Sequence, residues 1–139
     1  MAVKVVIAED SKLYRAILHR ILSRTAHSME VVGEAGDGAS AVEMVETLNP
    51  DLLLLDVNLP DMDGFSVLEE VRHRRPAIKI LMLTMYSGLI YSRQALAKGA
   101  NGYCTKDAHF GEIVAAIDAV LDGKTYLSPE ASPPQSFSS

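Results

Sequence analysis

Three carboxylates, a hydroxyl and an amine each follow a short apolar segment of this 139-residue sequence. These side chains belong to Glu9, Asp10, Asp56, Thr84 and Lys106. Carboxylates that share one pocket repel each other, so either their pKa values rise or a cation lies among them. Oxygen ligands suit Mg²⁺, which carboxylates commonly hold together with phosphate oxygens. With that charge neutralised, Asp56 could attack phosphorus as a nucleophile, while Lys106 and Thr84 bind phosphoryl oxygens.

Hydrophobic periodicity predicts the strands and helices that must bring these side chains together. Apolar runs such as Leu52–Leu55, directly before Asp56, are typical of buried parallel strands. Between these runs, apolar residues recur every three or four positions, as on one face of a helix. We expect Asp10 or Ser11 to cap the first helix and Asp107 the last. The expected strands are residues 3–8, 29–35, 52–56, 78–84 and 101–105, and the expected helices are residues 13–22, 41–48, 65–71, 89–97 and 110–121.

The strict alternation of strands and helices predicts an α/β fold. Such a pattern gives a parallel sheet with helices on both faces and right-handed crossovers. The expected arrangement is a flavodoxin-like (βα)5 doubly wound sheet with strand order 2-1-3-4-5. Ligands bind such sheets outside the carboxyl ends of the strands, near the switch in strand order. The five polar side chains are therefore expected to meet in one pocket.

Composition narrows the class of protein. The net charge is −5 and the pI about 5.3, which argues against a nucleic-acid-binding surface. The basic run 72–75 is expected to complement the dipole of the third helix instead. A single cysteine, Cys104, excludes an intrachain disulfide and a zinc site of the cysteine type. No signal peptide or membrane span is expected, so a cytoplasmic location is predicted. We expect one domain over residues 1–123, and a linker or disordered tail without an output domain over residues 124–139.

The motifs around these residues resemble a known family. Four features together resemble the receiver domain of two-component response regulators. They are the pair Glu9-Asp10, the stretch Leu-Leu-Leu-Leu-Asp-Val-Asn-Leu-Pro-Asp-Met-Asp-Gly around Asp56, the residue Thr84, and the stretch Gly-Tyr-Cys-Thr-Lys-Asp around Lys106. The resemblance covers about residues 3–123. The stretches 99–107 and 123–130 resemble the NarL/FixJ (LuxR-type) branch of that family.

The resemblance implies a phosphorylation switch rather than a turnover enzyme. Asp56 would be the phosphoacceptor, and the donor would be a phosphohistidine on a sensor histidine kinase. Asp10, Asp56 and the backbone carbonyl of Asn58 would bind Mg²⁺, with Glu9 assisting through water. Thr84 would move toward the phosphoryl group and Tyr103 would turn inward behind it. The surface of the fourth helix, fifth strand and fifth helix would then change and control an output, namely transcription through a helix-turn-helix domain that this chain lacks. Homodimerisation would use that surface or the first and fifth helices.

Several positions depart from the usual family pattern. Asp107 follows Lys106 where much of the family has proline, and a cis peptide without proline costs about 3 kcal/mol. Met85 follows Thr84, where a small residue is frequent, and it could crowd the phosphoryl pocket. Asn58, Met85 and Tyr86 lie where they would influence the lifetime of the phosphate.

Three other functions remain open from the residues alone. A flavodoxin-like flavoprotein would need a phosphate-binding loop after the first strand, but this loop is acidic. A phosphatase of the haloacid dehalogenase kind would need an acid two residues after the nucleophile, where Asn58 lies. A DNA-binding regulator would need a further domain, so no nucleic-acid binding is expected of this chain alone.

Overall fold

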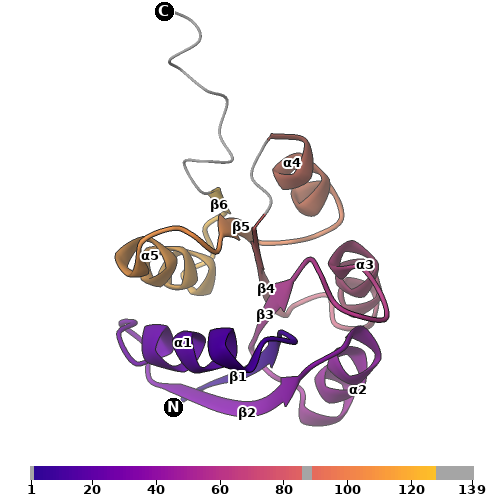
Figure 1. The fold of residues 1–139 in the computed structure, drawn as a ribbon, viewed down its shortest axis with the longest axis horizontal. Helices are drawn as coiled ribbons and strands as arrows, with labels where there is room; N and C mark the ends of the chain where they lie inside the picture. Colours follow the sequence, from indigo (N-terminus) through magenta and orange to yellow (C-terminus); the bar gives the residue numbers. More distant parts are fainter. Residues whose placement is uncertain (1, 86–88, 128–139) are drawn as a thin grey trace, which may run out of the picture.

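The protein is an open α/β structure built around one parallel sheet (Figure 1). The computed structural model describes residues 2–85 and 89–127. The sheet order is β2-β1-β3-β4-β5-β6, and every pair of neighbouring strands is parallel. The fold class and the order of the first five strands are thus confirmed. The strands are β1 (Val3–Ala8), β2 (Met29–Ala35), β3 (Leu52–Asp56), β4 (Lys79–Thr84), β5 (Gly102–Thr105) and β6 (Tyr126–Leu127), and the helices are α1 (Lys12–Leu22), α2 (Gly38–Leu48), α3 (Gly64–Arg74), α4 (Leu89–Ala97) and α5 (Phe110–Leu121).

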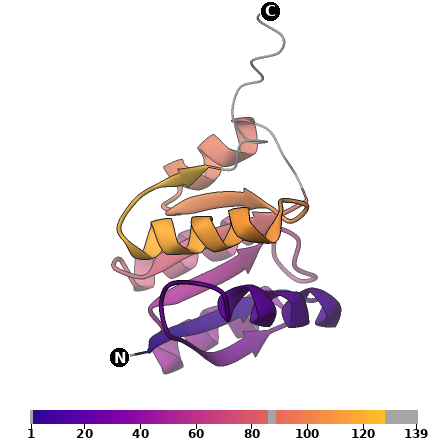
Figure 2. The ribbon, with the colours of Figure 1, turned by 90° about the vertical axis from the view of Figure 1, so that its left-hand side faces the viewer.

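The helices form a layer on each face of the sheet. Figure 1 shows α1 and α5 on one side and α2, α3 and α4 on the other, and Figure 2 shows α1 and α5 in front of the strands. The side chains of β3 alternate between the two cores, with Leu53 and Leu55 facing α2 and α3, and Leu52 and Leu54 facing α1 and α5. Because both faces are covered, β3 is an unbroken apolar run that ends in one carboxylate.

The edges of the sheet differ from its centre. The edge strand β2 is only partly buried, which agrees with its mixed sequence. At the opposite edge, β6 pairs with β5 through Gly102 and Tyr103, although the sequence predicted a linker from residue 124. Tyr126 packs on the α1 and α5 side and Leu127 on the other side, so this short strand contributes to both cores. The tail after Leu127 lies outside the described residues.

Side-chain caps begin α1, α2 and α3. Ser11 accepts a hydrogen bond from the backbone N–H of Tyr14 at the start of α1, and Asp37 caps α2 in the same way. The expected cap of α5 by Asp107 is wrong, because His109 is the N-cap residue and makes no side-chain capping bond. Residues 105–108 first form a turn, closed by the bond from the Ala108 N–H to the Thr105 carbonyl, so the helix begins later.

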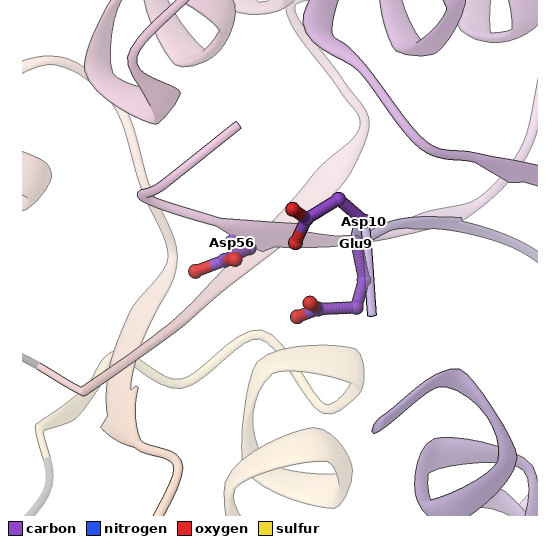
Figure 3. A group of neighbouring side chains, drawn as sticks. All are labelled: Glu9, Asp10 and Asp56. Carbon is purple, nitrogen blue, oxygen red and sulfur yellow. The ribbon is translucent and has the colours of Figure 1, made fainter. Parts of the chain in front are cut away.

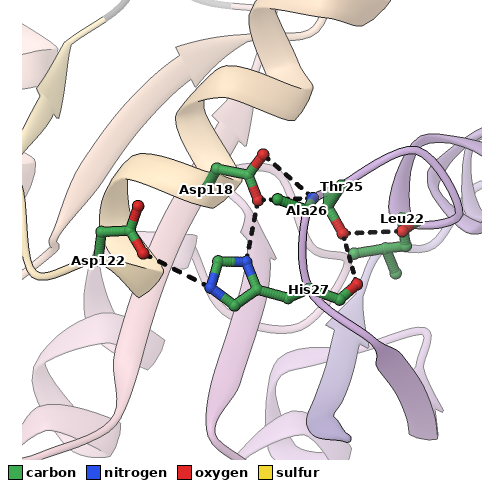
Figure 4. A network of polar contacts seen from close by, with 6 residues as sticks. All are labelled: Leu22, Thr25, Ala26, His27, Asp118 and Asp122. Carbon is green, nitrogen blue, oxygen red and sulfur yellow. Dashed lines mark hydrogen bonds and ion pairs between the residues drawn. The ribbon is translucent and has the colours of Figure 1, made fainter.

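A polar network ties the loop between α1 and β2 to α5 (Figure 4). The imidazole of His27 lies with Nδ1 3.0 Å from Asp118 and Nε2 3.5 Å from Asp122. Asp118 also accepts a hydrogen bond from the backbone N–H of Ala26, at 3.1 Å. This contact holds two segments that are about ninety residues apart in the sequence, and it explains the only histidine with two carboxylate partners in the described part of the chain.

Candidate functional site

The five predicted residues lie at the carboxyl ends of the central strands. Glu9 and Asp10 follow β1, Asp56 ends β3, Thr84 ends β4 and Lys106 follows β5. Figure 3 shows the carboxyl groups of Glu9, Asp10 and Asp56 gathered at this edge. One oxygen from each of these three residues lies within 4.8 Å of the others. The convergence follows from the register, because Ala8, Leu55 and Met82 pair across β1, β3 and β4.

Lys106 neutralises part of this acidic cluster. Its ammonium Nζ lies 2.5 Å from Glu9 Oε1 and 3.2 Å from Asp56 Oδ2. The Glu9 and Asp56 side chains are only 2% and 5% exposed, so water screens these charges poorly. Burial raises the pKa of Glu9, and hydrogen bonds from Lys106 and from the Ser11 backbone N–H partly offset that rise. Asp10 is exposed and offers an open side of the cluster to solvent.

The loop after β1 is held in place by Arg15, a residue that the sequence analysis did not single out. The Arg15 guanidinium donates a hydrogen bond to the backbone carbonyl of Glu9 and forms an ion pair with Glu34 at 3.1 Å. It therefore links α1, the end of β1 and strand β2. Only the spacing of Arg15 from Asp10 along the sequence could have suggested this role, and that spacing alone does not show which carbonyl the side chain meets.

The loop after β3 is tied both to Asp56 and to the neighbouring helices. The backbone N–H of Asn58 donates to Asp56 Oδ1 at 3.2 Å, and Asn58 forms an isolated antiparallel bridge with Asp63. Asp61 accepts hydrogen bonds from the backbone N–H groups of Gly38 and Ala39, at 2.6 and 3.0 Å. These bonds lower the pKa of Asp61. The loop is thereby fixed to the start of α2.

Thr84 and Tyr103 lie together behind the acidic cluster. Both side chains are fully buried, and Tyr103 packs in the core on the α4 side. Burial raises the pKa of Tyr103 to about 12, and a hydrogen bond with Thr84 partly offsets this rise. Tyr103 thus stays protonated and is coupled to the hydroxyl that ends β4.

Two departures from the family pattern, at Asp107 and Met85, can be compared with the structure. The peptide between Lys106 and Asp107 is trans, as are all the described peptide bonds. The Lys106 backbone N–H donates to the Thr84 carbonyl at 2.7 Å, so β4 positions this turn without a cis bond. Met85 is 64% exposed and does not fill the pocket. Tyr86 lies outside the described residues.

The deciding observation comes from comparison with known sequences. A family model described as response regulator receiver domain matches residues 5–118. The chain belongs to this family. The assignment favours the receiver interpretation over the flavoprotein and phosphatase alternatives, and the relatives below place the chain in the NarL/FixJ branch.

Relatives of the receiver domain are transcriptional regulators. The chain is 34% identical over 128 residues to the transcriptional regulatory protein DegU of Brevibacillus brevis, covering 92% of this chain and 54% of DegU. It is 37% identical over 127 residues to the probable transcriptional regulatory protein NarL of Mycobacterium tuberculosis, covering 91% and 58%. The chain therefore spans little more than half the length of these two relatives.

Solved structures agree with the sequence comparison. A two-component response regulator of the LuxR family from Aurantimonas superimposes with a TM-score of 0.88 at 30% identity, covering 94% of this chain and 93% of that one. The receiver domain of the putative response regulator NarL from Mycobacterium tuberculosis gives a TM-score of 0.77 at 38% identity, covering 88% and 95%. Within the described part of the receiver domain, no helix is long and apolar enough to cross a membrane.

Proposed function

We propose that this receiver domain accepts a phosphoryl group onto Asp56 from a phosphohistidine of a sensor histidine kinase. The observation that supports this most directly is the clustering of Glu9, Asp10 and Asp56, whose oxygens lie within 4.8 Å of one another, with the Lys106 ammonium against Glu9 and Asp56. A carboxylate oxygen of Asp56 attacks phosphorus, the phosphorus–nitrogen bond breaks, and the electron pair remains on the imidazole of the kinase. The product is an aspartyl phosphate.

The donor set fits Mg²⁺. Every side chain of the cluster offers oxygen, and the described residues place no histidine or cysteine in it. Asp10 and Asp56 would hold the ion with the backbone carbonyl of Asn58, and Glu9 would act through water. The bound ion supplies charge neutralisation at the phosphoryl oxygens. The chain itself orients Asp56, through the Asn58 N–H, and keeps Lys106 beside it.

Lys106 and Thr84 would bind the phosphoryl oxygens after transfer. The ammonium is already 3.2 Å from Asp56, and the Thr84 hydroxyl ends the neighbouring strand. A hydroxyl drawn toward the phosphoryl group would weaken its bond with Tyr103 and shift the surface of α4, β5 and α5. This is a two-state element biased by a local change of charge. Asn58, Met85 and Tyr86 would set how long the phosphate lasts.

The phosphorylated domain would act through partners rather than by turnover. Its chemistry would be limited to its own phosphorylation and dephosphorylation, in the cytoplasm. By analogy with the transcriptional regulators it resembles, the output would be transcription, through a DNA-binding domain outside this chain. Because the net charge is negative, we expect these residues alone not to bind nucleic acid. The surface of α4, β5 and α5, or that of α1 and α5, would mediate homodimerisation.

The test is incorporation of one phosphoryl group from acetyl phosphate and Mg²⁺, measured by intact mass spectrometry. Asp56→Asn should abolish the added mass. Asp51→Asn is the matched control, because Asp51 precedes the same strand at its far end and is exposed. Labelling that persists in Asp56→Asn, or that is lost equally in Asp51→Asn, contradicts the assignment. Transfer from a phosphorylated histidine kinase domain then tests the donor.

A further inference from the structure

Tyr14 places an aromatic ring beside the cation of the site. The Lys106 Nζ lies 4.6 Å from the centroid of the Tyr14 ring, in the range of a cation–π contact. Tyr14 belongs to the first turn of α1 and packs on the core formed by α1, α5 and the sheet. Neither the acid cluster nor the family motif includes this residue.

The hydroxyl of Tyr14 does not explain its position. It is buried and has no hydrogen-bond partner among the residues that the structure describes. Burial raises the pKa of Tyr14, and the nearby acidic groups add to that rise, so the ring remains neutral. A buried hydroxyl without a partner costs stability, so packing alone would favour phenylalanine or an aliphatic residue. The contact that Tyr14 does make with the site is through the face of its ring.

We propose that the Tyr14 ring is a positioning element that holds the Lys106 ammonium over Asp56 before the phosphoryl group arrives. Lysine carries a flexible stem whose freedom must be lost when its ammonium binds an oxygen. The ring confines that stem from the α1 side, while Glu9 and Asp56 hold the ammonium from the sheet. The ring carries no net charge, so it confines Lys106 without competing with the phosphoryl oxygens. This inference rests on the proposed function, because it assigns Lys106 to phosphoryl binding.

The first test is a double-mutant cycle on the rate of phosphorylation by acetyl phosphate at saturating Mg²⁺. We expect Tyr14→Leu to lower the rate roughly three- to thirty-fold, the effect of losing a partly desolvated cation–π contact. The conservative variant Tyr14→Phe should retain the rate, because it keeps the ring. In a Lys106→Met background, Tyr14→Leu should have no further effect. Mg²⁺ affinity should be unchanged in Tyr14→Leu, which separates positioning of Lys106 from damage to the acid cluster.

A matched control distinguishes positioning from packing. Tyr126 packs on the same core at the far edge of the sheet, so Tyr126→Leu should leave the rate unchanged. Tyr14→Met lacks a ring but fills much of the same space, so it should behave like Tyr14→Leu. It replaces the leucine variant in the test if that variant is unstable. If Tyr14→Leu and Tyr14→Met react like wild type, the inference is wrong. It is also wrong if, in the Lys106→Met background, these two variants still react more slowly than Tyr14→Phe.

A measurement without phosphorylation separates this inference from the proposed function. The Lys106 Cε–Hε signal in a ¹H–¹³C NMR spectrum should be shifted upfield by the ring in wild type and in Tyr14→Phe, and should return to the ordinary lysine position in Tyr14→Leu. An unshifted signal in wild type overturns the contact. A chain that shows the shift but accepts no phosphoryl group keeps the contact and contradicts the proposed function.

Discussion

Gly64 offers the sharpest test of how the loop after β3 positions Asp56. It begins α3 against the backbone at the end of β3, and a Cβ there would lie 2.5 Å from the Asp56 carbonyl oxygen and 2.6 Å from Val57 Cα. Both are backbone atoms, so no side chain can rotate away. Moving α3 outward would also break the bond from the Gly64 N–H to the Val57 carbonyl, 2.6 Å long. Overpacking costs about 1–3 kcal/mol and the lost hydrogen bond about 1 kcal/mol. We therefore expect Gly64→Ala to lower the free energy of unfolding by about 2–4 kcal/mol.

Urea unfolding and phosphorylation of Asp56 by acetyl phosphate are the two assays for this variant. Because the displaced peptide is that of Asp56 itself, the labelling rate should fall even under conditions where Gly64→Ala remains folded. Gly111→Ala in the first turn of α5 is the control, since a Cβ there has no described neighbour within 4 Å. That variant should gain up to about 1 kcal/mol from helix propensity. Wild-type stability and labelling in Gly64→Ala would refute the close-approach reasoning.

Three further predictions concern the surroundings of the site. Asp61 has a pKa lowered by the N–H groups that it caps, so its stabilising effect exists at neutral pH and is lost as pH falls below 3.8. Asp61→Asn should therefore be less stable than wild type at neutral pH and approach it in acid, as measured by urea unfolding across that range; a constant difference would contradict the linkage. Arg72 donates to the carbonyls of Gly99, Pro76 and Ile78 at 2.7–2.9 Å. In chemical denaturation, Arg72→Met should therefore lower the free energy of unfolding by about 2–3 kcal/mol. Arg93 is exposed, so the control Arg93→Met should change it little. Mg²⁺ at about ten times its Kd should stabilise the fold by about 1.4 kcal/mol in thermal melts, and Asp10→Asn should remove most of that gain; equal gains in both proteins would exclude Asp10 as a ligand.

The fold and the five main site residues were predictable because their signals are local and repeated. A strand buried on both faces must be apolar throughout, so the first polar residue after Leu52–Leu55 marks the end of the strand. Parallel strands all end at the same edge, which brings Asp56, Thr84 and Lys106 together without knowledge of the helix packing. The outline of the cluster therefore followed from sequence periodicity and the rule for open parallel sheets.

Features that depend on side-chain reach or on close backbone approach were not predictable. The strand β6 has only two residues and relies on Gly102, where a Cβ would lie 2.8 Å from Leu81 and 3.3 Å from the Tyr126 carbonyl oxygen. The basic run 72–75 suggested a helix dipole effect, yet Arg72 reaches past the end of α3 to four carbonyls and to Asn101. The Asp107 cap was wrong because a turn intervenes between β5 and α5.

The charge of the site explains why one lysine matters so much to it. Glu9, Asp10 and Asp56 form one cluster with a single ammonium against Glu9 and Asp56, which leaves two negative charges uncompensated when all three carboxylates are ionised. Under the proposed function, a divalent cation would balance that excess, and a phosphoryl group of charge about −2 on Asp56 would then upset the balance again. Lys106 is the only cation of the described chain that forms an ion pair with Asp56, so under the proposed function its ammonium would turn from Glu9 toward the new oxygens. Since the Lys106 backbone N–H is bonded to the Thr84 carbonyl, that turn would act on the strand end where Thr84 meets Tyr103. Two contacts would thus link a local imbalance of charge to the buried aromatic of β5.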